Sequence, residues 1–143
     1  MVDKKTYQEE IMEEKKEYRI IIAGCRYFED YEYVRKMAGE ITESIQIAEP
    51  DAKITIVSGA ANGADKLGER FAKEKGFDVK RFPANWTLYG KSAGPVRNRE
   101  MLMFAKEKKG ILIAFWDGVS RGTANMIKIS KDAGIPVFTF NFS

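Results

Sequence analysis

The sequence predicts an α/β protein in which a parallel sheet lies between two layers of helices. Two observations predict this fold. Short apolar runs alternate with helix-length amphipathic segments along the chain, which is typical of βαβ units. Several of these runs end in a glycine turn from which a helix begins. Right-handed crossovers then give, most simply, a three-layer α/β/α sandwich with the strand order 3-2-1-4-5.

The expected elements follow from hydrophobic spacing and from the residues that begin and end helices. Strands are expected at residues 19–23, 53–58, 77–82, 110–115 and 136–140. Helices are expected at about residues 31–48, 65–75, 95–109 and 123–133.

Single residues support these boundaries. Asp30 is expected to cap the first helix, whose apolar residues recur at helical spacing. Gly76 and Gly134 are stop signals for the second and the last helix. Pro95 suits the first turn of the third helix. The segment 83–94 is expected to be a long connection.

Composition limits the functions to consider. The chain has 143 residues, of which 44% are hydrophobic and 31% charged, as in an ordinary globular domain. We expect one domain at residues 19–143, preceded by a charged tail or frayed helix at residues 1–18. A net charge of +3 is too weak to argue for nucleic-acid binding. No signal peptide or membrane span is recognisable, so we expect a cytoplasmic protein.

Cysteine and histidine are scarce. The single cysteine, Cys25, cannot form an intrachain disulfide framework. The absence of histidine removes the commonest metal ligand and the commonest general base. We therefore expect no metal site, and we expect Cys25 to be a small buried hydrophobe that no histidine can activate.

Two junctions between a strand, a glycine loop and a helix are the strongest functional signal. Small residues after each apolar run would aim free backbone N–H groups and the positive end of a helix at one point. The topology brings both junctions, and a third glycine turn, to the carboxyl edge of the sheet. We therefore expect a site for a phosphate-bearing ligand. The expected contacts are Gly24 and Arg26 after the first strand, Ser58, Gly59, Asn62, Gly63 and Asp65 after the second, and Asp117, Gly118, Ser120, Gly122 and Thr123 after the fourth.

Some of these residues also have a purely structural interpretation. Arg26 offers a planar fork to phosphate, but it could be an ordinary surface arginine. Asp65 could accept from a ribose hydroxyl, although stabilisation by the helix dipole is the favoured interpretation. Thr123 could be an N-cap that still leaves backbone donors free for phosphate.

The helix that precedes the fourth strand adds basic candidates. Arg97 near its start is unfavourable for the helix dipole, which hints that this residue serves an anion. Lys91 and Asn98 are further expected ligand contacts. Trp86 could stack on a base or could hold a long loop in place. Because the first and fourth strands are adjacent in the expected order, Arg26 and Arg97 are expected to converge on one anion.

Two segments of the chain resemble a known family signature. Residues 82–86 (FPANW) and 90–98 (GKSAGPVRN) are similar to FPADW…GKxAGPIRN, which marks the YspA-like branch of the SLOG superfamily, often found in phages and bacteria. Residues 58–65 and 115–126 also fit, and the similarity runs from about residue 19 to residue 140. The resemblance implies a Rossmann-like fold and recognition of a nucleotide or nucleotide-derived ligand. It does not name a reaction.

More distant relatives imply two other activities. Residues 117–125 resemble the PGGxGTxxE loop of the Lonely Guy phosphoribohydrolases, and Arg97 resembles their catalytic arginine. Their catalytic glutamate falls at Asn125 or Met126, neither of which can be a general base. Asp65, Glu100 or Asp117 would have to replace it. The candidate catalytic residues are Arg97, with Glu100 and Asp65 as the first replacements for the glutamate.

The other relative is DNA-processing protein A, which binds single-stranded DNA. Its IVGSR and SGxAxGID elements look like residues 22–26 and 58–65. A groove for single strands needs a basic stripe with stacking aromatic residues, whereas the charge here is nearly balanced.

We therefore expect a protein that binds or senses a nucleotide derivative. Hydrolysis of a nucleotide-type substrate is the second hypothesis and binding of single-stranded DNA the third. No cofactor is expected beyond the nucleotide-type ligand, and no membrane partner. A homo-oligomer is compatible with the sequence.

Overall fold

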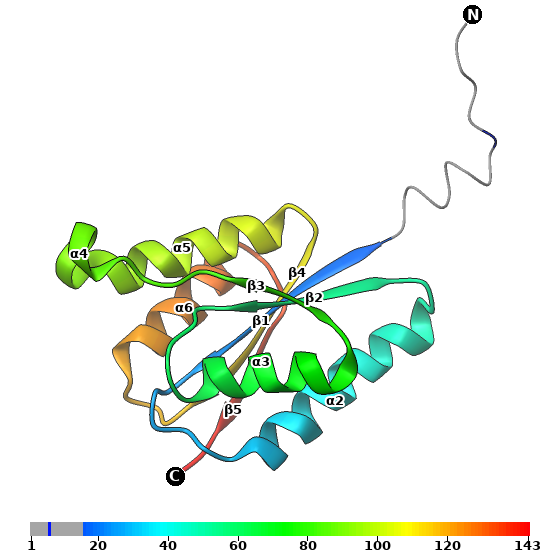
Figure 1. Cartoon of the computed structure of the whole chain (residues 1–143), viewed down its shortest axis with the longest axis horizontal. Helices are drawn as coiled ribbons and strands as arrows, with labels where there is room; N and C mark the ends of the chain where they lie inside the picture. The colour runs from blue at the N-terminus through cyan, green and yellow to red at the C-terminus, as the bar shows by residue number, and fades with distance from the viewer. Residues whose placement is uncertain (1–5, 7–15) are drawn as a thin grey trace, which may run out of the picture.

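The structure, a computed structural model, describes Thr6 and residues 16–143. It contains a parallel five-stranded sheet in the order β3-β2-β1-β4-β5 (Figure 1). The predicted strand order and the α/β fold are confirmed. The strands are β1 (Glu17–Gly24), β2 (Lys53–Ser58), β3 (Asp78–Arg81), β4 (Lys109–Trp116) and β5 (Val137–Asn141).

Helices cover both faces of this sheet (Figure 1). α2 and α3 pack on one face, and α5 and α6 pack on the other. A short helix and a 3₁₀ turn connect β3 to α5. The helical elements are α2 (Tyr31–Ala48), α3 (Ala64–Lys75), α4 (Trp86–Tyr89), η1 (Gly90–Ser92), α5 (Ala93–Lys106) and α6 (Arg121–Asp132).

The central strand β1 supplies both halves of the core. Its alternate side chains point to opposite faces, so Ile20 and Ile22 pack against α2 and α3. Ile21 and Ala23 pack against α5 and α6. All four are buried, which explains why the strand is a continuous apolar run and shows no alternation.

Several predicted helix boundaries are confirmed. α2 spans the predicted residues, and the Asp30 side chain accepts a hydrogen bond from the Tyr33 N–H at 3.1 Å. α3 ends at Lys75, and its C-cap is Gly76, whose φ of +75° lies in the left-handed region that glycine adopts without strain.

The connection after β3 is more ordered than predicted. Residues 83–94 hold α4 and η1, and α5 begins at Ala93, before Pro95. The Asn85 side chain accepts from the Leu88 N–H at 3.0 Å and so caps α4. An N-cap asparagine at this position was the local signal for a helix.

The start of α6 corrects one prediction. Thr123 is not the N-cap, because α6 begins at Arg121 and its N-cap is Ser120. Asp117 causes this earlier start, since its side chain accepts from the backbone N–H groups of Val119 and Ser120 and closes the turn before the helix.

Most of the predicted charged tail lies outside the described residues. β1 begins at Glu17, two residues before the predicted strand. Lys16 pairs with Glu49 at 2.8 Å. Within the part of the chain that the structure describes, no helix has the length and apolar character needed to cross a bilayer.

Gly24 ends β1 where three elements meet. A β-carbon at this position would collide with the Phe115 carbonyl oxygen of β4 and lie 2.8 Å from the Ala64 β-carbon of α3. The backbone of β1 therefore approaches β4 and α3 more closely than any side chain would permit.

We expect Gly24→Ala to destabilise the protein by about 1–3 kcal/mol, because the added methyl group forces backbone apart in a packed region. Urea unfolding monitored by circular dichroism measures the change. Gly39→Ala is the matched control, since its new β-carbon in α2 meets nothing within 4 Å. That variant should be neutral or more stable by about 0.5–1 kcal/mol. Equal midpoints for the two variants would contradict the prediction.

Candidate functional site

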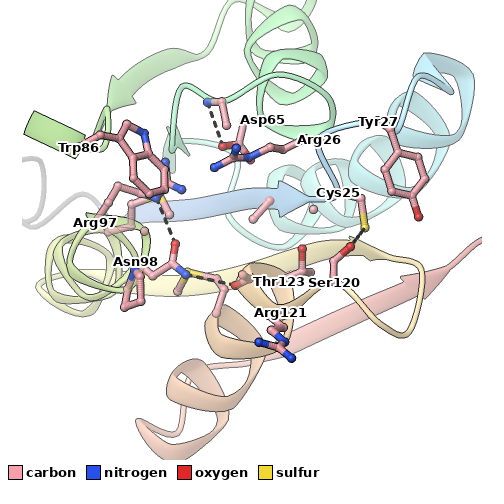
Figure 2. Close-up of a pocket in the computed structure, with 18 residues that line it drawn as sticks. Cys25, Arg26, Tyr27, Asp65, Trp86, Arg97, Asn98, Ser120, Arg121 and Thr123 are labelled. Carbon is pink, nitrogen blue, oxygen red and sulfur yellow. Dashed lines mark hydrogen bonds between the residues drawn. The ribbon is translucent and has the colours of Figure 1, made fainter. Parts of the chain in front are cut away.

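A pocket of about 480 Å³ opens at the carboxyl edge of the sheet (Figure 2). It lies where β1 and β4 are neighbours and the crossovers run in opposite directions, which is the usual ligand position in such sheets. The loop after β1 and the first turns of α3, α5 and α6 contribute to its wall. The predicted site residues that line it are Gly24, Arg26, Asp65, Arg97, Asn98, Ser120, Gly122 and Thr123.

Asp65 is a buried carboxyl in the wall of this pocket, with 5% of its surface exposed. Its Oδ2 accepts a hydrogen bond from the Ala61 N–H at 3.2 Å. Burial raises the pKa of Asp65 to about 6, an effect that Arg97, the Ala61 N–H and Arg26 only partly offset and that Glu69 reinforces. No described residue donates a hydrogen bond to Oδ1, so this oxygen is left for a proton or a ligand.

Arg97 is held rigidly beside Asp65. Its Nη1 donates a short hydrogen bond to the Gly59 carbonyl, and its Nε donates to Asn98 Oδ1 at 3.1 Å. A β-carbon at Gly59 would lie 2.6 Å from Arg97 Nη1 and 2.7 Å from Asp65 Oδ2. Both charged groups therefore occupy space that only a glycine leaves free. Burial lowers the pKa of Arg97, and Asp65 opposes that shift.

Arg26 enters the same pocket from the loop after β1 (Figure 2). Its guanidinium carbon lies 5.4 Å from the centre of the Trp86 ring, within the range of a cation–π contact. The structure thus brings Arg26 and Arg97 to one pocket. Their expected convergence on one anion requires this arrangement. Trp86 remains half-exposed, so part of its ring is open for stacking.

Asn98 joins two helices at the pocket floor. Its Nδ2 donates to the Gly122 carbonyl at 3.2 Å and to Asn125 Oδ1 at 3.0 Å. These bonds fix the start of α6 against α5. Asn98 is 5% exposed, and its side-chain amide is already hydrogen-bonded to Arg97, Gly122 and Asn125, so it positions these neighbouring groups.

The N-terminus of α6 faces the pocket with unused donors. Asp117 Oδ1 accepts from the Val119 and Ser120 N–H groups at 2.9 Å and 2.8 Å, and Oδ2 accepts from the Ser120 hydroxyl and from Tyr27. The next three backbone N–H groups, those of Arg121, Gly122 and Thr123, donate to no acceptor in the described structure.

The hydrogen bonds to Asp117 shift two pKa values. The Tyr27 hydroxyl, followed by the Ser120 and Val119 N–H groups, holds the pKa of Asp117 well below its usual range. The same bond raises the pKa of Tyr27 to about 12. Asp117 therefore stays ionised and shapes the loop, and it does not line the pocket itself.

Two predicted contacts are used inside the fold. Ser58 is fully buried, and its hydroxyl donates to Glu69 Oε2 at 2.6 Å. Gly63 has a φ of +81°, and a β-carbon there would collide with the backbone of Cys25 and Arg26. The adjacent Ala64 N–H donates to the Cys25 carbonyl at 3.2 Å. The first backbone N–H of α3 is therefore not available to a ligand, because it is already bonded within the protein.

Other predicted residues lie outside the pocket wall. These are Gly59, whose carbonyl binds Arg97, and the exposed residues Asn62, Lys91, Glu100 and Gly118. Glu100, one turn further along α5, acts to raise the pKa of Arg97 through its negative charge.

The structure adds residues that the sequence did not single out. Arg121 lies at the first position of α6 and lines the pocket, as does Tyr27. The basic residue next to Gly122 was a usable signal for the first, whereas nothing local marked the second. Cys25 is 2% exposed, as predicted, and its sulfur lies 3.1 Å from the Ser120 hydroxyl oxygen. Among residues 16–143 and Thr6, no cluster of three or more His, Cys, Asp or Glu side chains could hold a metal ion.

The raised pKa of Asp65 predicts a pH-dependent stability. The group binds its proton more tightly in the folded protein than at its ordinary value of 3.8, so its stabilising contribution is full below about pH 4 and is lost as the pH rises through about 6. Asp65→Asn keeps an acceptor for Ala61 and cannot ionise. Relative to the native protein, this variant should gain about 3 kcal/mol in unfolding free energy between about pH 4 and about pH 8.

Urea unfolding of both proteins at the two pH values measures this change. The comparison at low pH is the internal control, because it contains every effect of the substitution except ionisation. If the two proteins differ in unfolding free energy by the same amount at both pH values, burial does not raise the pKa of Asp65.

Comparison with known proteins identifies a family and a phage relative. The model of the YspA, cpYpsA-related SLOG family (YAcAr) matches residues 18–89, from β1 through α4. The chain is 33% identical over 128 residues to the Gene 61 protein of Mycobacterium phage D29, covering 85% of this chain and 95% of the phage protein. No solved structure matches the chain. The protein belongs to the YspA, cpYpsA-related SLOG family.

Proposed function

We propose that this pocket binds a nucleotide or a nucleotide-derived ligand, with a phosphate group at the N-terminus of α6. The observation that carries the proposal is the set of three consecutive backbone N–H groups, of Arg121, Gly122 and Thr123, that meet the pocket without an acceptor in the described structure. Such a helix end combines free donors with the positive end of the helix dipole. The Arg121 side chain adds a full positive charge at the same place.

The opposite wall suits a planar base. Trp86 lines the pocket with a half-exposed ring, and aromatic rings stack on bases of any sequence. A pocket of about 480 Å³ is within the size range of small-molecule sites. Membership of the SLOG family supports a nucleotide-related ligand as a class, without identifying the ligand.

One observation favours a second candidate function, hydrolysis of the N-glycosidic bond of a nucleotide. A general acid or base works best when its pKa lies near the working pH, and Asp65 combines a pKa of about 6 with a place beside Arg97. Asn125 and Met126, which fall where the phosphoribohydrolases have their glutamate, supply no such group: Asn125 binds Asn98 and Met126 is buried.

Gly122→Val tests the phosphate position. Nothing lies within 4 Å of a β-carbon at Gly122, so the fold should tolerate the side chain, which would fill the space next to the free N–H groups. We expect AMP and ADP to bind at least roughly tenfold more weakly, since a charge-assisted contact contributes about 1.5–3 kcal/mol. Isothermal titration calorimetry measures the affinities.

Gly39→Val is the matched control for that experiment. It places the same β-branched residue in a helix, also with nothing within 4 Å, but in α2 and away from the pocket. Its nucleotide affinity should equal that of the native protein. Unchanged affinity in Gly122→Val, with folding verified by circular dichroism, would refute the phosphate position.

Release of free base separates binding from hydrolysis. The binding hypothesis predicts negligible conversion of AMP and water to adenine and ribose 5-phosphate, because no carboxylate stands where the phosphoribohydrolases have their catalytic glutamate. Chromatography of the reaction mixture detects the base. Turnover by the native protein that disappears in both Asp65→Asn and Arg97→Ala would instead establish the second candidate.

A further inference from the structure

Three charged residues at the α3 side of the pocket form a cluster whose hydrogen bonding is incomplete. Asp65 is buried, yet its Oδ1 accepts no hydrogen bond from any described residue. Arg26 reaches toward it from the loop after β1, and Arg97 approaches from α5 (Figure 2). Among the described residues, neither arginine comes within 4.0 Å of the Asp65 carboxylate oxygens as an ion pair. The three groups act on one another electrostatically without pairing.

The arginines retain donors for a ligand. Arg97 uses Nε for Asn98 and Nη1 for the Gly59 carbonyl, which leaves Nη2 without an acceptor in the described structure. Arg26 donates to no described acceptor, and its guanidinium lies over the Trp86 ring. A planar guanidinium held by two of its nitrogens is well suited to binding an oxyanion, because little freedom remains to be lost.

Charge balance indicates which kind of anion the cluster can bind. Two guanidinium groups match a dianion such as phosphate only when Asp65 is neutral, because an ionised carboxylate would repel the ligand in a site of low dielectric constant. A protonated Asp65 also gains a donor at its unpartnered oxygen, which could bond a phosphate oxygen. A proton from solvent thus removes the repulsion and completes the hydrogen bonding.

We propose that Asp65, Arg26 and Arg97 form a second anion subsite, which admits a phosphate-like group together with one proton on Asp65. The first subsite is the N-terminus of α6. The ligand class is then a nucleotide that carries two anionic groups, such as a nucleoside diphosphate. Only this identification of the ligand rests on the proposed function, since the subsite itself can be tested with a simple anion.

The groups that face Asp65 determine the sign of the pH dependence. Arg97 on α5, Arg26 on the β1–α2 loop and the Ala61 N–H favour the ionised form, whereas Glu69 on α3 disfavours it. Glu69 itself is held by Ser58 and by Arg81 at 3.3 Å. A bound anion adds a further negative charge and raises the pKa of Asp65 above the value of about 6 reached without ligand. Affinity must therefore increase as the pH falls toward about 6 and level off below it.

Sulfate is the test probe, because it remains a dianion throughout this pH range and cannot itself supply the proton. Binding is followed by amide chemical shifts in NMR, with Ala61 reporting on the cluster and Gly122 on α6. The chemical shift of the Asp65 carboxyl carbon reports its protonation directly. We expect sulfate affinity at Ala61 to rise about tenfold between about pH 7.5 and about pH 5.5, and the Asp65 titration to move upward in sulfate.

Two variants test whether the pH dependence arises from Asp65 and its arginines. Asp65→Asn should bind sulfate at Ala61 with an affinity that no longer depends on pH. Arg26→Gln changes an exposed loop residue whose side chain donates to no described acceptor, so the fold should tolerate it. This variant should weaken sulfate at Ala61 roughly tenfold at about pH 5.5. Gly122→Val is the matched control: it should abolish the shifts at α6 and leave the pH-dependent binding at Ala61.

The outcomes distinguish the two proposals. Sulfate binding at Ala61 that is independent of pH, or a pH dependence that persists in Asp65→Asn, overturns the second subsite. Shifts confined to α6 overturn it as well and leave the proposed function standing. If sulfate binds at Ala61 in a pH-dependent way but AMP and ADP have no affinity, the subsite is supported and the nucleotide proposal is contradicted.

Discussion

The site depends on a close backbone junction at the carboxyl end of β1. The Cys25 N–H donates to the Phe115 carbonyl of β4 at 3.2 Å, and the Cys25 carbonyl accepts from the Ala64 N–H of α3 at 3.2 Å. Gly24 and Gly63 make these approaches possible, since a β-carbon at either would meet backbone. One short segment thus ties β1, β4 and α3 together and determines where Arg26 leaves the chain and enters the pocket.

That junction explains why two glycine-rich loops of similar sequence have different roles. The loop before α3 uses its first helical N–H to bind the Cys25 carbonyl, so its glycine serves packing. The loop before α6 is closed by the side chain of Asp117, which leaves the following N–H groups unbonded in the described structure. A carboxylate that organises a loop from outside the pocket therefore has more effect on the availability of donors than glycine content does.

The sequence predicted the fold well and the site less completely, for a physical reason. Hydrophobic spacing determines which segments become buried strands, and chain connectivity then limits the strand order, so both are readable along the chain. Side-chain partners are set by tertiary contacts. Ser58 was expected to meet a ligand, but its hydroxyl donates to Glu69, and Tyr27 joins the pocket because Asp117 binds it. Arg26 and Arg97 were predictable together because adjacent parallel strands share one edge.

The two ends of the pocket use different kinds of charge. At α6 the donors are backbone N–H groups, which do not titrate, and the nearby Asp117 stays ionised because several donors hold its pKa low. At α3 the carboxyl of Asp65 is buried, has a single hydrogen bond from the described residues and has a pKa of about 6. Burial acts to raise the pKa at both aspartates, but the hydrogen-bond donors around Asp117 outweigh it, whereas the single donor at Asp65 does not. On the two proposals made above, the anion at α6 would bind independently of Asp65, and the anion at α3 would bind together with a proton.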